Sequence, residues 1–275
     1  MVLQGADVLI VVAQDGQAAV TAVDAAAREG IPVIAYDRLI PSPNLAAYLS
    51  FDNVAVGEAQ AEGVTAVQDS GRFVLLGGSP VDNNARLFRK GQMNVLQPLI
   101  DAGDIQVVAD QWVENWDPNN ALNLMENILT AQNNNVDAVV ASNDGTALGA
   151  LQALSAQGLE GEVPISGQDA TLAGCKSIVE GELTVTVFKD VRKLSPAAMD
   201  MAIQLAQGEE VSGLQDFTLA ELTLDDSLEG SVPCLFLPVV KVTEDTVYEE
   251  VILTGFQPYD EVYANVPEDE RPPRP

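Results

Sequence analysis

The chain has 275 residues, of which 41 are acidic and only 13 are basic, so its formal net charge is −28. This excess of acid disfavours nucleic acids and anionic membrane surfaces as partners, because like charges repel. The chain also contains no histidine, which excludes serine–histidine and cysteine–histidine nucleophiles and histidine-ligated metal sites.

Short apolar runs alternate along the chain with segments whose apolar residues recur at helical spacing. Strands are predicted at residues 7–13, 31–36, 73–76, 105–109, 136–141, 163–166 and 183–188. Helices are predicted at residues 17–29, 54–69, 84–99, 119–132, 146–157, 171–180 and 195–207. Residues 211–253 add further short strands and one helix near 244–250. Repeated βα units with short loops predict an α/β fold of doubly wound parallel sheets.

Cysteine content and hydropathy indicate whether the chain carries disulfides, metal sites, membrane spans or a signal peptide. Cys175 and Cys234 fit no zinc motif and lie in apolar segments, so buried free thiols are expected, the alternative being one disulfide in an exported protein. No apolar run of about 18 residues is present, so no membrane span is predicted. The first five residues lack the basic start and apolar core of a signal peptide.

The loop that follows the strand at 73–76 carries the most distinctive sequence. It reads Gly-Gly-Ser-Pro-Val-Asp-Asn-Asn from residue 77, with Asn83 or Asn84 the expected N-cap of the next helix. It lacks the Gly-Lys-Ser/Thr of a phosphate-binding loop. In an open α/β sheet, ligands bind beyond the carboxyl ends of the strands, where this loop lies. A capped turn without a ligand and a ligand-binding loop both fit this stretch alone.

Polar side chains follow the predicted strands at several carboxyl ends. They are Asp37, Arg38, Asn84, Trp116, Asn143, Asp169 and Lys189. Each one alone is more often a helix cap or a solvated charge. Together, carboxylates, amides and cations around an aromatic ring fit a sugar, whose hydroxyls both donate and accept and whose C–H face packs on a ring.

Several blocks of the sequence closely resemble the D-xylose-binding proteins of bacterial ABC importers, within the ribose/galactose-type sugar-binding family. They include Ala35–Arg38, Gly77–Arg89, Asp110–Val113 and Ile165–Ala170, and the resemblance runs from about residue 5 to about residue 210. It implies a type I periplasmic binding protein, with two lobes joined by three hinge strands and a monosaccharide in the cleft. Sugar contacts are implied at Asp37 and Arg38 in the first lobe. Others are implied in the second, at Asn84, Arg89, Trp116, Asn143 and Asp169, with Lys189 at a hinge.

The same resemblance predicts the division of the chain. Residues 7–51 and 190–232 are expected to form the first lobe, and residues 52–189 and 233–263 the second. Residues 264–275 are rich in proline and charge and are expected to be disordered. The family begins with two βα units that have no counterpart here, so we expect a shortened first lobe. Its strand at 7–13 then becomes an exposed apolar edge that is prone to pair with another chain.

The leading hypothesis is the substrate-binding subunit of an ABC importer, located in the periplasm or exported to the cell surface. Its partners would be a monosaccharide, foremost D-xylose, and the importer's permease and ATPase, with no cofactor or metal. An enzyme is disfavoured because no dinucleotide or phosphate loop and no acid/base pair is evident. The alternative is a sugar-sensing domain of a chemoreceptor or sensor kinase, since one fold serves many functions.

Overall fold

The computed structural model describes residues 5–275 and divides into two compact units. Unit 1 comprises the chain up to Asn53, together with Val81–Leu87 and Asp190–Pro238. Unit 2 comprises Val54–Pro80, Phe88–Lys189 and Val239–Pro275. Residues 1–4, on which the expected absence of a signal peptide largely rests, lie outside the described residues.

The two units do not follow the expected lobe boundaries at every point. The segment Val81–Leu87, and with it Asn84, belongs to unit 1 rather than to the second lobe. The last boundary follows Pro238 instead of residue 232, because the whole of strand β10 (Ser231–Leu237) pairs within unit 1. Both differences arise from contacts between segments far apart in the sequence, which local patterns do not encode.

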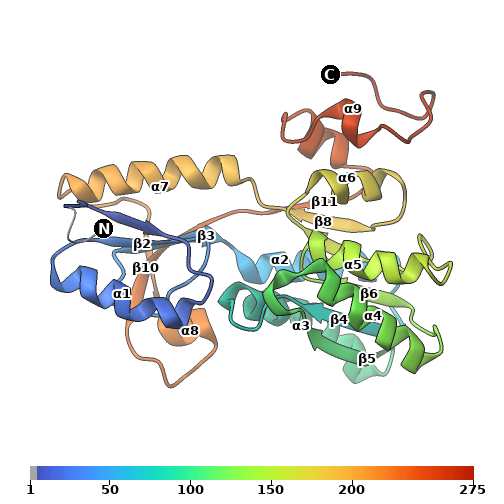
Figure 1. Ribbon diagram of the computed structural model, residues 1–275, viewed down its shortest axis with the longest axis horizontal. Helices are drawn as coiled ribbons and strands as arrows, with labels where there is room; N and C mark the ends of the chain where they lie inside the picture. The colour runs from blue at the N-terminus through green and yellow to red at the C-terminus, as the bar shows by residue number, and fades with distance from the viewer. Residues whose placement is uncertain (1–4) are drawn as a thin grey trace. The chain divides into compact units, whose positions relative to one another are not determined.

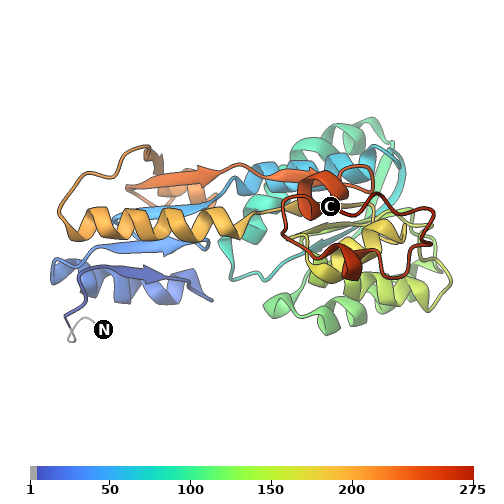
Figure 2. The same ribbon diagram turned by 90° about the horizontal axis from the view of Figure 1, so that it is seen from above.

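Unit 1 is built on a five-stranded sheet of order β1-β2-β3-β10-β9. The other strands are β1 (Leu9–Val11), β2 (Val33–Tyr36), β3 (Ala47–Phe51) and β9 (Gln215–Thr218). All pair in parallel except β9, which runs antiparallel to β10. Helix α7 (Val191–Ala206) lies along one face, and α1 (Gly16–Arg28) and α8 (Leu219–Thr223) lie on the other (Figures 1 and 2).

The strands of unit 1 differ in burial according to their place in the sheet. All five residues of β3 are buried, because β3 lies in the middle of the sheet, where helices cover both faces. Strand β1 is the edge of the described sheet, and the side chain of Ile10 is 40% exposed. Burial of the 7–13 run on both faces, which a continuous apolar run would suggest, is therefore not what the structure has.

Unit 2 contains two three-stranded sheets, β5-β4-β6 and β7-β8-β11, connected by a bridge between Val139 and Ile165. The strands are β4 (Gly71–Gly77), β5 (Ile105–Trp112), β6 (Ala138–Ala141), β7 (Ser166–Gln168), β8 (Val185–Phe188) and β11 (Val240–Val242). Only β11 runs antiparallel to its neighbour. The carboxyl ends of the five parallel strands therefore share one edge.

Five helices connect these strands. They are α2 (Asn53–Thr65), α3 (Asn83–Ala102), α4 (Pro118–Gln132), α5 (Asp144–Ser155) and α6 (Leu172–Val179). Helices α4 and α5 pack at close range over Gly149, where a Cβ atom would lie only 2.3 Å from the carbonyl oxygen of Pro118. A larger residue at position 149 would force the two helices apart, so this position requires glycine.

The C-terminal segment, for which disorder is expected, makes hydrogen bonds with residues that precede it. It follows a five-residue π-helical turn at Tyr248–Ile252, close to the predicted helix, and the short helix α9 (Tyr259–Val262). The Tyr248 hydroxyl donates to the carbonyl of Pro273 at 2.7 Å, and the Tyr259 hydroxyl to that of Pro272 at 2.6 Å.

Two further sequence predictions concern cysteines and membranes. Cys175 and Cys234 are both free and buried, and burial raises the pKa of each thiol to about 12. Within residues 5–275, no helix combines the length and the apolar character needed to cross a bilayer.

Candidate ligand-binding site

In unit 1, the predicted contacts Asp37 and Arg38 form the turn that follows β2. Asp37 has a φ of 60°, a left-handed conformation that residues with a Cβ atom rarely adopt. Its carbonyl oxygen accepts hydrogen bonds from Ser50 Oγ at 2.7 Å, from Tyr48 Oη at 3.0 Å and from Asn84 Nδ2 at 3.0 Å. Side chains from β3 and α3 therefore hold the turn in this strained conformation.

The Arg38 guanidinium is fixed on two sides. Its Nε lies 3.1 Å from Oδ2 of Asp82, and its Nη1 donates to Oε1 of Gln14 at 2.7 Å. The other oxygen of Asp82 accepts from the backbone N–H of Asn84 at 3.0 Å. Asp82, rather than the predicted Asn83 or Asn84, is thus the residue that caps α3, and it also orients Arg38.

Asn84 is only 2% exposed and mainly holds other groups in place. Its Oδ1 accepts from Tyr48 Oη at 3.1 Å and from Asn53 Nδ2 at 3.0 Å, which uses both lone pairs. Its Nδ2 donates one hydrogen to the carbonyl of Asp37, so one N–H is left to offer a ligand. Burial raises the pKa of Tyr48 well above its usual value, which keeps its hydroxyl protonated as a donor.

In unit 2, the remaining predicted contacts gather at the carboxyl edge of the strands. Trp116 follows β5, Asn143 follows β6, Asp169 follows β7, Lys189 follows β8, and Arg89 lies in the second turn of α3. The order β5-β4-β6 places the strands that follow β4 on either side of it, which is the topological switch point where α/β proteins bind ligands.

Trp116 packs over Gly78 and against Phe88. Its ring meets that of Phe88 edge-on, with centroids 6.3 Å apart, and Lys189 Nζ lies 5.7 Å from the centroid of the same phenylalanine. A Cβ atom at Gly78 would come within 1.9 Å of the indole, so this close approach requires glycine. The predicted contacts Trp116 and Lys189, distant in sequence, therefore both pack against the buried ring of Phe88.

Arg89 is 11% exposed and carries a guanidinium with an unsatisfied edge. Its Nη1 pairs with Asp110, its carbon lies 5.2 Å from the ring centroid of Trp112, and its Nε donates to Gln92 at 2.9 Å. Its Nη2 is buried and has no hydrogen-bond partner within the described chain. A buried donor without an acceptor costs about 1–3 kcal/mol, so a ligand oxygen at this point would be stabilising.

Asn143 and Asp169 supply complementary groups on neighbouring strand ends. Asn143 caps α5 by accepting from the N–H of Thr146 at 2.8 Å, and its amide nitrogen has no hydrogen-bond partner in residues 5–275. Asp169 has a φ of 99° and accepts from Gln168 Nε2. The edge thus presents an amide donor next to a carboxylate acceptor, which is the combination that a hydroxyl group can satisfy.

Asp144, which the sequence did not single out, holds the Asp169 loop from beneath. This fully buried carboxylate accepts from the N–H and hydroxyl of Thr171, at 2.8 and 2.9 Å, and from the hydroxyl of Thr186 at 2.7 Å. Thr186 Oγ1 in turn accepts from the N–H of Ala170 at 3.2 Å. Burial raises the pKa of Asp144 to about 7, because desolvation penalises the charged form more than these hydrogen bonds favour it.

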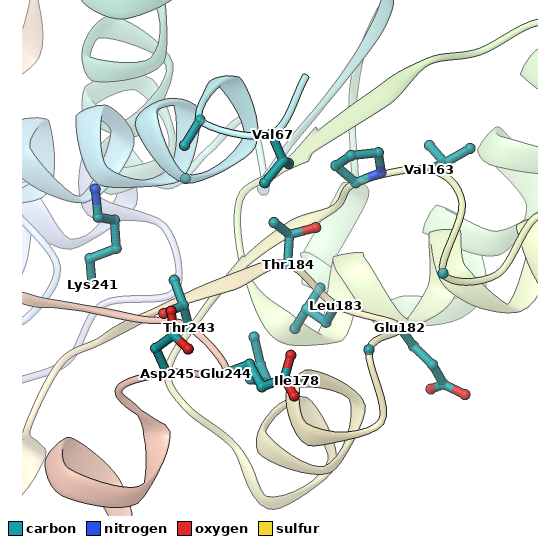
Figure 3. Close-up of a pocket in the computed structure, with 15 residues that line it drawn as sticks. Val67, Val163, Ile178, Glu182, Leu183, Thr184, Lys241, Thr243, Glu244 and Asp245 are labelled. Carbon is teal, nitrogen blue, oxygen red and sulfur yellow. The ribbon is translucent and has the colours of Figure 1, made fainter. Parts of the chain in front are cut away.

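A separate hollow of about 450 Å³ opens at the opposite end of the unit 2 strands (Figure 3). Its lining includes Thr184, Ile178 and Leu183 (Figure 3). Pro164 also lines it, and Pro164 and Thr184 precede β7 and β8. Lys241 at its side is paired with Glu62 at 3.3 Å. None of the predicted contacts lines this hollow, so it is not the site that the sequence predicts.

The residues described here contain no group of three or more acidic or cysteine side chains arranged to hold a metal ion. The groups at the carboxyl edge of unit 2 are instead guanidinium, amide and carboxylate groups, which can pair with hydroxyls. A family model described as "Periplasmic binding protein domain" matches residues 1–210. The chain belongs to this family.

Similar proteins of the family carry names that agree with this chemistry. The chain is 49% identical to the D-xylose-binding periplasmic protein of Haemophilus influenzae over 263 residues, which is 96% of this chain and 77% of that protein. It is 48% identical to the protein of the same name from Escherichia coli, over 95% of this chain and 77% of that protein.

Solved structures of the family share the fold. A carbohydrate transporter solute-binding protein from Chloroflexus aurantiacus in complex with D-glucose superposes with a TM-score of 0.83 and 33% identity, covering 94% of this chain and 82% of that one. An ABC transporter solute-binding protein from Clostridium phytofermentans with bound β-D-glucose has the same TM-score, with 29% identity, 95% coverage of this chain and 84% of that chain. The predicted type I periplasmic binding protein fold is therefore confirmed, with antiparallel strands added at sheet edges.

Proposed function

We propose that this protein is the substrate-binding subunit of an ABC importer and that it binds a monosaccharide, with D-xylose the first candidate. The observation that carries the proposal is the buried Arg89 guanidinium, which has an unsatisfied N–H; an amide and a carboxylate lie on adjacent strand ends of the same unit. Such a set donates to and accepts from neighbouring hydroxyls. The two relatives named for D-xylose support the choice of sugar.

The roles of the individual residues follow from their chemistry. Arg89 and Asn143 would donate to sugar oxygens, and Asp169 would accept from hydroxyls. The Trp116 ring would pack on a C–H face of the sugar. In unit 1, Asp37 and Arg38 would contact sugar hydroxyls and Asn84 would add its one remaining N–H. In unit 2, Lys189 would contribute charge next to Phe88.

The proposed partners and location come from the relatives. The relatives are named periplasmic, and the neighbouring structures are described as transporter solute-binding proteins. We therefore propose export to the periplasm or cell surface and delivery of the sugar to a permease that is driven by an ATPase.

Isothermal titration of the purified chain with D-xylose, D-glucose, D-ribose and D-galactose tests the proposal. We expect saturable binding with D-xylose the tightest. Arg89→Met should weaken it by at least about tenfold, since about 1.4 kcal/mol corresponds to tenfold. Arg192→Met, at a half-exposed arginine on α7, is the matched control and should leave the affinity unchanged. The absence of heat with all four sugars would reject the proposal.

A further inference from the structure

Two glutamines in unit 2, Gln60 on α2 and Gln92 on α3, are completely buried. Each stands in a row of buried apolar residues on its helix: Gln60 lies four residues from Val56 and Val64, and Gln92 four residues from Leu96. Residues spaced by four share one helix face, so these amides occupy core positions. A buried amide is costly unless it is hydrogen-bonded, which raises the question of what the two side chains hold.

The two amides form one continuous chain of hydrogen bonds. Gln60 Nε2 donates to the carbonyl of Ser142 at 2.9 Å, with the carbonyl of Gly167 at 3.4 Å. Gln92 Nε2 donates to Gln60 Oε1 at 2.8 Å. Arg89 Nε donates to Gln92 Oε1 at 2.9 Å. The chain thus runs from the ends of β6 and β7 to the guanidinium on α3.

The direction of every bond in this chain is determined by its two ends. Backbone carbonyls only accept and a guanidinium only donates. Gln60 must therefore turn its nitrogen toward Ser142 and its oxygen toward Gln92, and Gln92 must turn its oxygen toward Arg89. Rotating either amide by half a turn would place two acceptors or two donors face to face.

The buried chain is the firmer of the two polar anchors of Arg89. Its other polar partner, Asp110, has a side chain that is 48% exposed, and ion pairs at exposed positions contribute little. A hydrogen bond to a fully buried amide is not screened in this way. The Nε anchor sets the plane of the guanidinium, and this plane decides where the unsatisfied Nη2 points.

We propose that Gln92, supported by Gln60, is a positioning residue that holds the Arg89 guanidinium in the orientation that binds the sugar. The inference rests on the proposed function, in which Arg89 contacts a monosaccharide. The same network also contacts the segments that carry two other proposed contacts. Ser142 directly precedes Asn143, and Gly167 directly precedes the Gln168–Asp169 pair.

A double-mutant cycle on the full chain, with D-xylose as the ligand in isothermal titration, tests this role. Gln92→Met keeps the side-chain length but removes the acceptor, and should weaken binding by about tenfold. Gln97→Met, at an exposed glutamine of the same helix, is the control and should leave affinity unchanged. In the Arg89→Met background, adding Gln92→Met should change the affinity by less than about twofold, because Gln92 acts through Arg89.

The outcomes separate the two proposals. An unchanged affinity of Gln92→Met, while Arg89→Met weakens binding, would overturn the positioning role and leave the proposed function standing. A tenfold loss that persists in the Arg89→Met background would also overturn it, since the effect would then not pass through Arg89. If Gln92→Met does not fold, Gln60→Met removes the acceptor that holds Gln92 Nε2; it should weaken binding in the parent but not in the Arg89→Met background, and an unchanged affinity would overturn the role. If the parent binds none of the four sugars, both proposals fail.

Discussion

The two units hold their polar groups in place by different means. In unit 1 the Asp37–Arg38 turn is fixed at one backbone atom, because the buried side chains of Tyr48, Ser50 and Asn84 converge on the carbonyl oxygen of Asp37. In unit 2 the contact segments are fixed from beneath, by the fully buried side chains of Asp144, Gln60 and Gln92. The unit 1 supports therefore meet at a single atom of one turn, whereas the unit 2 supports are spread over several contact segments.

The largest expected difference lies in the stability of the sheets. Strand β6 is buried at all four residues and has β4 and β7 as neighbours, while β1 pairs only with β2 and is partly exposed. Amides of β6 should exchange with solvent at least about a thousandfold more slowly than those of β1, since local opening ranges from nearly free to global unfolding. Hydrogen exchange followed by mass spectrometry measures the exchange rates of the two strands. Similar protection of β6 and β1 would contradict the expected difference in their stability.

The next largest effect concerns the pH dependence set by Asp144. Its pKa in the folded chain is about 7, above the ordinary value of 3.8, so the folded state binds this proton more tightly than the unfolded state does. The stability from this group is full below about pH 4 and is lost as the pH rises through 7. Asp144→Asn should remove this dependence, so the unfolding free energy of the parent relative to the variant should fall by on the order of a few kcal/mol over that range.

Denaturant unfolding at several pH values measures this difference. Asp225→Asn in unit 1 is the control, because hydrogen bonds from Ser227 hold the pKa of that exposed carboxyl below its usual value and its dependence has the opposite sign. A parent-to-variant difference that stays constant from pH 4 to pH 7 would show that Asp144 is ionised throughout.

A smaller effect is expected from the hydroxyl that holds the unit 1 turn. Tyr48→Phe removes the donor to Asp37 and Asn84 and leaves buried acceptors less satisfied, which should cost about 1–3 kcal/mol of unfolding free energy. Sugar affinity should fall with it, because the turn carries two proposed contacts. Tyr36→Phe, whose hydroxyl bonds to Ser195 at an exposed site, should change stability by less than about 0.5 kcal/mol. Equal effects of both variants would show that the turn does not depend on Tyr48.

The smallest effect is expected at the aromatic surface of unit 2. Trp116→Phe keeps a ring but reduces its area, so sugar affinity should fall by about threefold, within the ~0.5–1.5 kcal/mol range of aromatic contacts. The variant should also lose most of the tryptophan fluorescence change on sugar addition. A fluorescence response that survives the substitution would assign the signal to Trp112 instead.

The sequence located the polar strand ends because alternating βα units leave little choice of topology. Once the strands are parallel, Asn143, Asp169 and Lys189 must share one edge, and the structure has them there. Most of the longer elements were also found to within a few residues, but strand β3 was not predicted. The extension of β5 to Trp112 was missed, because its last residues are polar and do not continue the apolar run.

The supporting residues could not be found by the same means. Gln60, Gln92 and Asp144 act through contacts with segments that are distant in sequence, and in isolation they resemble ordinary helix residues. One signal was present: an amide spaced by four residues from apolar side chains, as Val56-Gln60-Val64 shows, marks a polar group on a core face. The assignment of Val81–Leu87 to unit 1 had no such signal, because it depends on Asp82 and Asn84 reaching Arg38 and Asp37.

The anchoring of Arg89 before any ligand arrives has a consequence for stereochemical selection. A donor that is already rigid loses little conformational entropy on binding, but it also cannot rotate to follow a displaced oxygen. D-Xylose and D-ribose differ in the configuration at one carbon, so a single hydroxyl points in a different direction in the two sugars. A preorganised guanidinium would reject the wrong epimer by leaving its N–H unmatched, whereas a mobile arginine would adapt to both.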